Sequence, residues 1–134
     1  MDDCVFCKIV KGLKDEDKIW EDDEFLAILD INPCARGHVM VIPKEHFRWV
    51  WDIDDEKYSR YMLVVKKVAG FLREAFGTDC VQSAIVGMDV SHAHVHLLPR
   101  VEGDGFKGIP VTPIEPKPTA EEMKEIFDKI RAVV

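Results

Sequence analysis

Three histidines, His92, His94 and His96, occupy alternate positions, although the whole chain contains only five. The residues between and after them are apolar and partly β-branched, which predicts a strand. Because side chains alternate faces along a strand, the three imidazoles should point the same way, with neighbouring rings on the order of 6–7 Å apart. Ala93 and Val95 should then point into a core. Such a row of imidazoles can bind a metal ion, move protons or attack an electrophile.

Cys4 and Cys7 form a Cys-x-x-Cys pair, which supplies half of a tetrahedral zinc site. Any of the five histidines could supply the other two ligands. His46 follows Pro43 at the end of an expected strand, where side chains are free to converge. Two thiolates and two imidazoles would close a structural site with no open position. The alternative is a pair of buried thiols without a metal ion.

A histidine outside the metal site could act as a nucleophile. A neutral imidazole nitrogen attacks phosphorus well near pH 7, because its pKa is about 6.5. A neighbouring histidine could protonate the leaving group. The alternating row therefore allows one ligand, one nucleophile and one proton donor to be separated by position alone.

The composition limits the class of protein. The 134 residues are 47% hydrophobic and 32% charged, which is typical of one globular domain. The formal net charge of −7 disfavours general binding of nucleic-acid backbone. Apolar runs are much shorter than the roughly 20 residues of a membrane span, and the acidic start Met1-Asp2-Asp3 does not look like a signal peptide. We therefore expect a cytoplasmic location with no membrane partner.

Hydrophobic periodicity predicts an antiparallel α+β domain. A long helix should begin at a cap on Asp54 or Asp55 and end near Phe76, before Gly77. A second helix should begin at a capping box that starts at Thr119. A proline-rich strap, 110–118, should precede it. The expected strands are 18–21, 25–30, 38–42, 81–86 and the histidine run 91–98.

The run His92-Ala93-His94-Val95-His96-Leu97-Leu98 matches the pattern His-φ-His-φ-His-φ-φ. The chain therefore resembles the histidine-triad (HIT) superfamily, most closely its Hint-type and bacterial or archaeal branches. The resemblance extends to 4–10, 25–30, 37–46, Pro99-Arg100 and the stretch from Gly103 to Phe106. It implies a HIT-like fold over 1–134 as a single domain, with an antiparallel five-stranded sheet, one long central helix and a C-terminal helix.

The resemblance also implies roles for individual residues. His94 would be the nucleophile on the α-phosphate of a nucleotide, His96 would contact the phosphate and the leaving group, and His38 would support the site by hydrogen bonding. Asp30 would hold the ribose hydroxyls. The apolar walls around the base would be Phe6, Ile9, Ile28 and Ile31. The zinc ligands would be Cys4, Cys7, His46 and His92.

The implied reaction is nucleotidyl transfer to His94 followed by hydrolysis. The implied substrates are purine nucleotide conjugates, such as nucleoside phosphoramidates and dinucleoside polyphosphates. Zinc would be structural, no organic cofactor would be needed, and the chain would form a homodimer through the central helix and an edge strand.

The chain departs from the family pattern just before the triad. Many members have Gly-Gln-Ser-Val or Gly-Gln-Thr-Val, whereas this chain has Gly87-Met88-Asp89-Val90. Asp89 therefore occupies the position of a hydroxyl that contacts the phosphate. A carboxylate there is unfavourable unless it points away or is protonated. Two alternatives remain open. His92, His94 and His96 could hold the metal of a metal-dependent hydrolase, and Met88 and Asp89 are compatible with a nucleotide-binding protein with weak or no catalysis.

Overall fold

The computed structural model describes residues 3–14, 16–105 and 108–134, so Met1, Asp2 and Phe106 lie outside the described residues. A five-stranded antiparallel sheet has the order β1-β2-β3-β5-β4, which confirms the expected sheet. The strands are β1 Lys18–Glu21, β2 Phe25–Leu29, β3 Val39–Pro43, β4 Val81–Ala84 and β5 Val95–Pro99. The helices are α1 Val5–Val10, η1 Val50–Asp52, α2 Asp55–Phe76 and α3 Ala120–Arg131.

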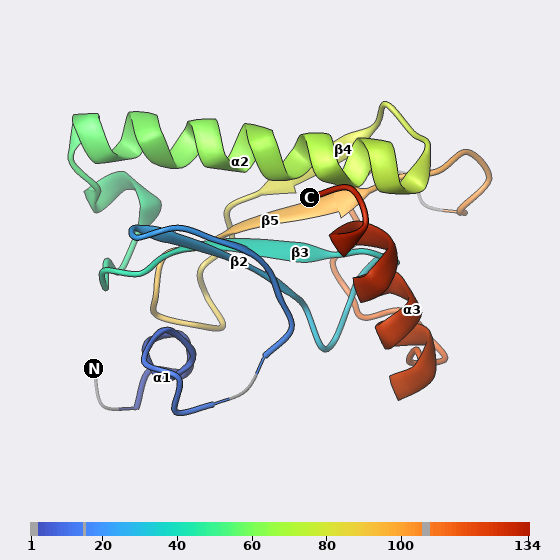
Figure 1. Cartoon of the computed structure of the whole chain (residues 1–134), viewed down its shortest axis with the longest axis horizontal. Helices are drawn as coiled ribbons and strands as arrows, with labels where there is room; N and C mark the ends of the chain where they lie inside the picture. The colour runs from blue at the N-terminus through green and yellow to red at the C-terminus, as the bar shows by residue number, and fades with distance from the viewer. Residues whose placement is uncertain (1–2, 15, 106–107) are drawn as a thin grey trace.

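Helix α2 lies across one face of the sheet (Figure 1). The side chain of Asp54 accepts a hydrogen bond from the Lys57 amide and caps the first turn, while Gly77 ends the helix in the left-handed conformation at φ 59°. Both boundaries agree with the prediction. The buried hydroxyl of Tyr61 donates to the Val41 carbonyl at 2.6 Å, which ties the helix to the central strand β3. The main hydrophobic core therefore lies between α2 and the sheet.

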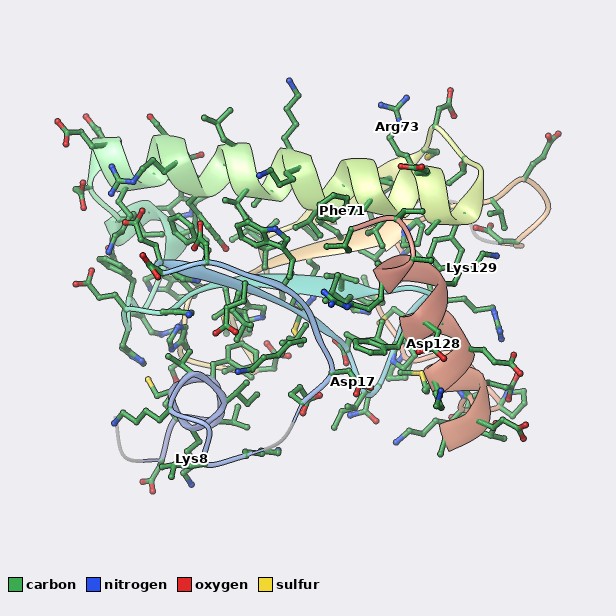
Figure 2. All side chains as sticks on the ribbon, viewed as in Figure 1. Lys8, Asp17, Phe71, Arg73, Asp128 and Lys129 are labelled. Carbon is green, nitrogen blue, oxygen red and sulfur yellow. The ribbon has the colours of Figure 1, made fainter. Side chains whose placement is uncertain are left out.

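Helix α1 covers part of the opposite face (Figure 1). Its buried residues Phe6 and Ile9 pack on a second apolar cluster that belongs to β2 and β3. Lys8 points away from the sheet on the outer side of this helix (Figure 2). Because α1 covers only one end of this face, His96 on β5 is left beside a cavity.

Helix α3 packs at one end of the sheet (Figure 1). Its first turn has the expected capping box, in which Thr119 and Glu122 bond each other's backbone amide. Ile126 and Ile130 are buried in the main core, and Arg131 donates to the Ile19 carbonyl of β1 at 2.9 Å. The helix therefore covers the end of the sheet that carries β1. Lys129 lies on its outer side (Figure 2).

The largest differences from the predicted strands are that β4 ends at Ala84 and that β5 begins only at Val95. Residues 5–10, for which no element was predicted, form a helix. The Ala93 amide donates to the Phe47 carbonyl at 2.7 Å, so His92 and His94 are held by a loop before β5 joins the ladder. Within the described residues, the helices are too short or too polar to span a membrane.

Candidate active site

His94 presents a ring nitrogen with a free lone pair. Its Nδ1–H donates to the carbonyl of His92 at 2.8 Å, so the lone pair lies on Nε2. The residue is 1% exposed, and its Nε2 has no hydrogen-bond partner among the described residues. The edge-on ring of Phe6, 5.1 Å away between centroids, packs beside it. A neutral imidazole held in this way is suited to nucleophilic attack.

His38 and His96 have the opposite arrangement of protons. The Cys34 amide donates to His38 Nδ1 at 3.0 Å, so His38 carries its proton on Nε2. That nitrogen lies 2.9 Å from His96 Nδ1 and donates to it. The remaining proton of neutral His96 must then be on its Nε2. His96 is therefore set as a hydrogen-bond donor beside His94, and the two ring centroids are 4.7 Å apart.

Burial keeps both supporting imidazoles neutral. Desolvation, together with the neighbouring His94, lowers the pKa of His38 and of His96 to about 4 in each case. Burial also raises the pKa of the Asp30 carboxyl. Asp30 Oδ2 lies 3.5 Å from His38 Nε2. Near pH 7 this contact is not an ion pair, because His38 is uncharged.

A second cluster joins Cys4, Cys7, His46 and His92. The sulfur of Cys7 lies 3.3 Å from His46 Nδ1 and 3.5 Å from His92 Nδ1, and Cys4 Sγ lies 3.4 Å from His92 Nδ1. The two Nδ1 atoms are 3.1 Å apart. Tetrahedral zinc with ordinary bond lengths would place S and N about 3.5 Å apart and the two N atoms about 3.3 Å apart. The four donor atoms therefore fit a zinc ion.

Neighbouring backbone groups orient these donors. His92 Nε2–H donates to the Pro43 carbonyl at 2.7 Å, which leaves the Nδ1 lone pair for the cluster. The short helix α1 carries both thiols, with Cys4 at its N-cap and Cys7 one turn later. Burial and the hydrogen bond that the Cys7 thiol donates to Cys4 raise the pKa of the Cys7 thiol, whereas a bound cation would favour the thiolate.

The histidine row is divided rather than uniform. His92 faces the cysteines, and His94 and His96 approach more closely than the two-residue strand spacing predicted. The three rings do not offer their ligand atoms to one common point. The described residues contain two groups with close ligand atoms, the cluster at Cys4 and a group made of Asp30, His38 and His96. In the second group, the Cys34 amide keeps a proton on His38 Nε2, which argues against a metal ion there.

A cavity of about 320 Å³ lies beside His38 and His96. It is lined by Asp30, His38, His96 and Asp89, and is closed on another side by the apolar segment 109–113. Phe6, Ile9 and Ile28, the base walls predicted on the sheet and α1, are buried in the second apolar cluster. Ile31 is 50% exposed, next to Asp30.

Sequence reasoning missed three parts of this site. The Cys34 amide and the Pro43 carbonyl set the tautomers of His38 and His92, but backbone groups leave no signal in residue type. The cavity wall at 109–113 was interpreted only as a tail strap. Its apolar residues among prolines, Ile109 and Val111, were a signal that could have identified it.

Comparisons with known proteins agree with this arrangement. The HIT domain family model matches residues 11–103. The chain is 41% identical over 113 residues to an uncharacterized HIT-like protein of Borreliella burgdorferi, covering 79% of this chain and 81% of that protein. It is 36% identical over 126 residues to the adenosine 5'-monophosphoramidase hnt1 of Schizosaccharomyces pombe, covering 90% and 95%.

A solved structure shows the same fold. The zinc-bound histidine triad family protein of Mycobacterium smegmatis superposes with a TM-score of 0.82 at 33% identity, covering 98% of this chain and 93% of that one. The relatives therefore include a named hydrolase and a zinc-bound structure. Together with the match over residues 11–103, these findings show that the chain belongs to the HIT family.

Proposed function

We propose that this chain hydrolyses nucleotide conjugates at the α-phosphate through a covalent nucleotidyl-His94 intermediate. The observation that carries the proposal is the buried, unpartnered Nε2 of His94, whose lone pair is directed by the bond from Nδ1 to the His92 carbonyl. Hydrolase activity is found among named relatives of the family, including the phosphoramidase of S. pombe. For this chain we propose phosphoramidates as the class of substrate and a covalent step as the route.

The first step forms a bond between His94 Nε2 and the α-phosphorus and breaks the bond to the leaving group. A phosphoramidate nitrogen that is already protonated departs as a neutral amine, so the charges balance. The resulting nucleotidyl-imidazolium keeps its Nδ1–H on the His92 carbonyl. His96 Nε2–H is placed to donate a hydrogen bond to the phosphoryl group or the leaving atom.

The second step consumes water. Attack on phosphorus forms the new P–O bond, breaks the P–N bond and returns the electron pair to His94 Nε2, and one proton is released. His38 acts as a positioning residue, because it touches His96 and not the reacting atoms. We further propose that Asp30 binds the ribose and that Ile31, with the apolar cluster of Phe6, Ile9 and Ile28, forms the base side of the site.

We also propose that zinc binds Cys4, Cys7, His46 and His92 in a structural role. All four protein donors are used, so the cation has no open position for substrate. The chemistry then depends on His94 and its neighbours rather than on a metal-bound water.

A mass measurement tests the covalent step. Wild-type protein mixed with adenosine 5'-phosphoramidate and quenched within seconds should gain one adenylyl group. His94→Ala should show no adduct and should lose at least about 10³-fold in turnover, since removal of a nucleophile eliminates the covalent route. His96→Ala should retain the adduct but form it more slowly.

No histidine can serve as a remote control, because His46 and His92 belong to the cysteine cluster and the other three lie together at the proposed active site. Cys80→Ser, at an exposed position, is the matched control and should behave as wild type. Turnover by His94→Ala at the wild-type rate would overturn the proposal. Activity that follows metal occupancy without any adduct would favour the metal-dependent alternative.

A further inference from the structure

The described residues around the cavity beside His94 place carboxylates there without a balancing cation. Asp30 and Asp89 both line it, and its described lining contains neither lysine nor arginine. The two imidazoles that line it, His38 and His96, are neutral near pH 7 because their pKa values are about 4. From the described lining, an anionic substrate therefore receives hydrogen bonds but no charge compensation from a lysine or arginine side chain.

Asp89 lies close to the proposed point of attack. Its Oδ1 lies 3.9 Å from His94 Nε2, although the side chain is 68% exposed. The same oxygen accepts a hydrogen bond from the Val90 amide at 3.0 Å, which holds the carboxylate in the loop before the triad. The loop itself is anchored by Gly87 at φ 72°, where an added Cβ would come within 2.5 Å of Trp49.

A substrate phosphate that reacts at His94 approaches this carboxylate. To react, phosphorus must come within about 3–3.5 Å of His94 Nε2. Its oxygens and its leaving group then lie within a few ångströms of Asp89. Each extra negative charge at such a distance, in a partly hydrated site, costs about tenfold in binding, and a positive charge gains a similar factor.

We infer that Asp89 is a specificity-determining residue, which makes the site select nucleotide conjugates with a cationic leaving group and reject polyphosphates. The inference rests on the proposed function, because it concerns the same α-phosphate and the same nucleophile. It predicts that a leaving group with a second, protonated amine gives a higher kcat/KM than a neutral one of the same size. A dinucleoside polyphosphate should be a poor substrate.

A matched series of adenosine phosphoramidates tests this selectivity. The leaving amines are 1,4-diaminobutane, butylamine and 4-aminobutyrate, whose far ends are positive, neutral and negative. A diadenosine polyphosphate is included as the substrate expected to react poorly. Wild type should rank them cation, neutral, anion in kcat/KM. In Asp89→Asn the ratio of cation to anion should fall by about tenfold, whereas Asp89→Glu should retain it. The ratio in wild type should also fall as salt is raised, because salt screens exposed charges.

Asp23→Asn removes an exposed acidic residue from the turn between β1 and β2 and should leave the ratio unchanged. The same compounds titrated into His94→Ala test the charge preference by affinity, independently of turnover. Affinities that do not depend on the charge of the leaving group would overturn the inference. So would an unchanged ratio of cation to anion kcat/KM in Asp89→Asn. Charge-ordered binding with no turnover or adduct in wild type would instead overturn the proposed function. If Asp89→Asn does not fold, the salt dependence and Asp89→Glu decide.

Discussion

His94 and His96 expose different chemistry because different groups hold their Nδ1 atoms. A carbonyl accepts the Nδ1–H of His94, which leaves Nε2 as a lone pair. The Nδ1 of His96 instead accepts a proton from His38, which leaves Nε2–H as a donor. Two identical side chains, two residues apart, thus present a lone pair on one Nε2 and an N–H on the other.

The buried imidazoles predict acid sensitivity. The pKa of His38 and of His96 is about 4 in the folded chain and about 6.5 in the unfolded chain, so the unfolded state binds more protons between these values. Stability should be complete above about pH 6.5 and should fall as the pH drops toward 4. Chemical unfolding at pH 7, 6 and 5 measures this loss.

Because other groups also titrate in this range, a variant isolates the effect. His38→Asn removes one of the two depressed groups and should make the loss between pH 7 and 5 clearly smaller than in wild type. Equal pH slopes for the two proteins would contradict the assignment of His38 as a neutral, buried base.

Helix α1 shows how a small element depends on side-chain ligands. Six residues are too few for a stable helix by themselves, and only Phe6 and Ile9 are buried. Its other attachment is the pair of thiols that face His46 and His92. If zinc occupies this cluster, the ion stabilises both the helix and the start of the triad.

Removal of a thiol should therefore cost stability more than chemistry. Cys4→Ser or Cys7→Ser should lower the free energy of unfolding by about 2 kcal/mol or more, a fall of roughly 6–10 °C in Tm for a chain of this size. Activity per folded molecule should fall less. Calorimetry, elemental analysis for zinc and turnover measure the three quantities.

Cys80→Ser, at an exposed thiol, is the matched control. A chelator should shift wild type toward the Tm of the cysteine variants and should leave those variants unchanged. A zinc content near zero in wild type, together with an unchanged Tm in Cys7→Ser, would refute the zinc site.

Local sequence signals predicted the helix ends better than the strand ends. The caps at Asp54, Gly77 and Thr119 were identified because each depends on residues within one turn. The start of β5 was placed too early, because the alternating pattern around His92 continues although the Ala93 amide bonds to Phe47. Pattern alone does not show where a strand joins its neighbours.

At the scale of the molecule, the site draws on four distant parts of the chain. These are α1, the loop and strand from Asp30 to His46, the triad run, and the segment 109–113. Residue types and the family resemblance predicted most of the members. They could not predict that 109–113 would line the cavity, because that depends on the path of a proline-rich segment with no periodic pattern.

Strands β1 and β4 form the two edges of the sheet. Helix α3 packs against β1, where Arg131 donates to the Ile19 carbonyl. An uncovered edge favours pairing with a second copy. We predict a dimer through β4 and α2, with a mass in sedimentation of about twice the 15.3 kDa of one chain. Leu63, exposed on α2, is placed to contribute.

Leu63→Glu should weaken this dimer by at least about tenfold, since it would place a charge in an apolar contact. Leu13→Glu, at a similarly exposed leucine beyond α1, should leave the mass unchanged. A monomeric mass for wild type at micromolar concentration would contradict the prediction.

His92 serves the two halves of the site through different atoms. Its ring faces the thiols, while its backbone carbonyl orients His94. Any residue at position 92 would supply the same backbone carbonyl, whatever its side chain. Evolution could therefore replace the ring and abandon the metal while the nucleophile kept its tautomer, provided that the loop held its shape. Metal binding and the orientation of His94 can therefore be lost or kept independently during evolution, even though one residue contributes to both.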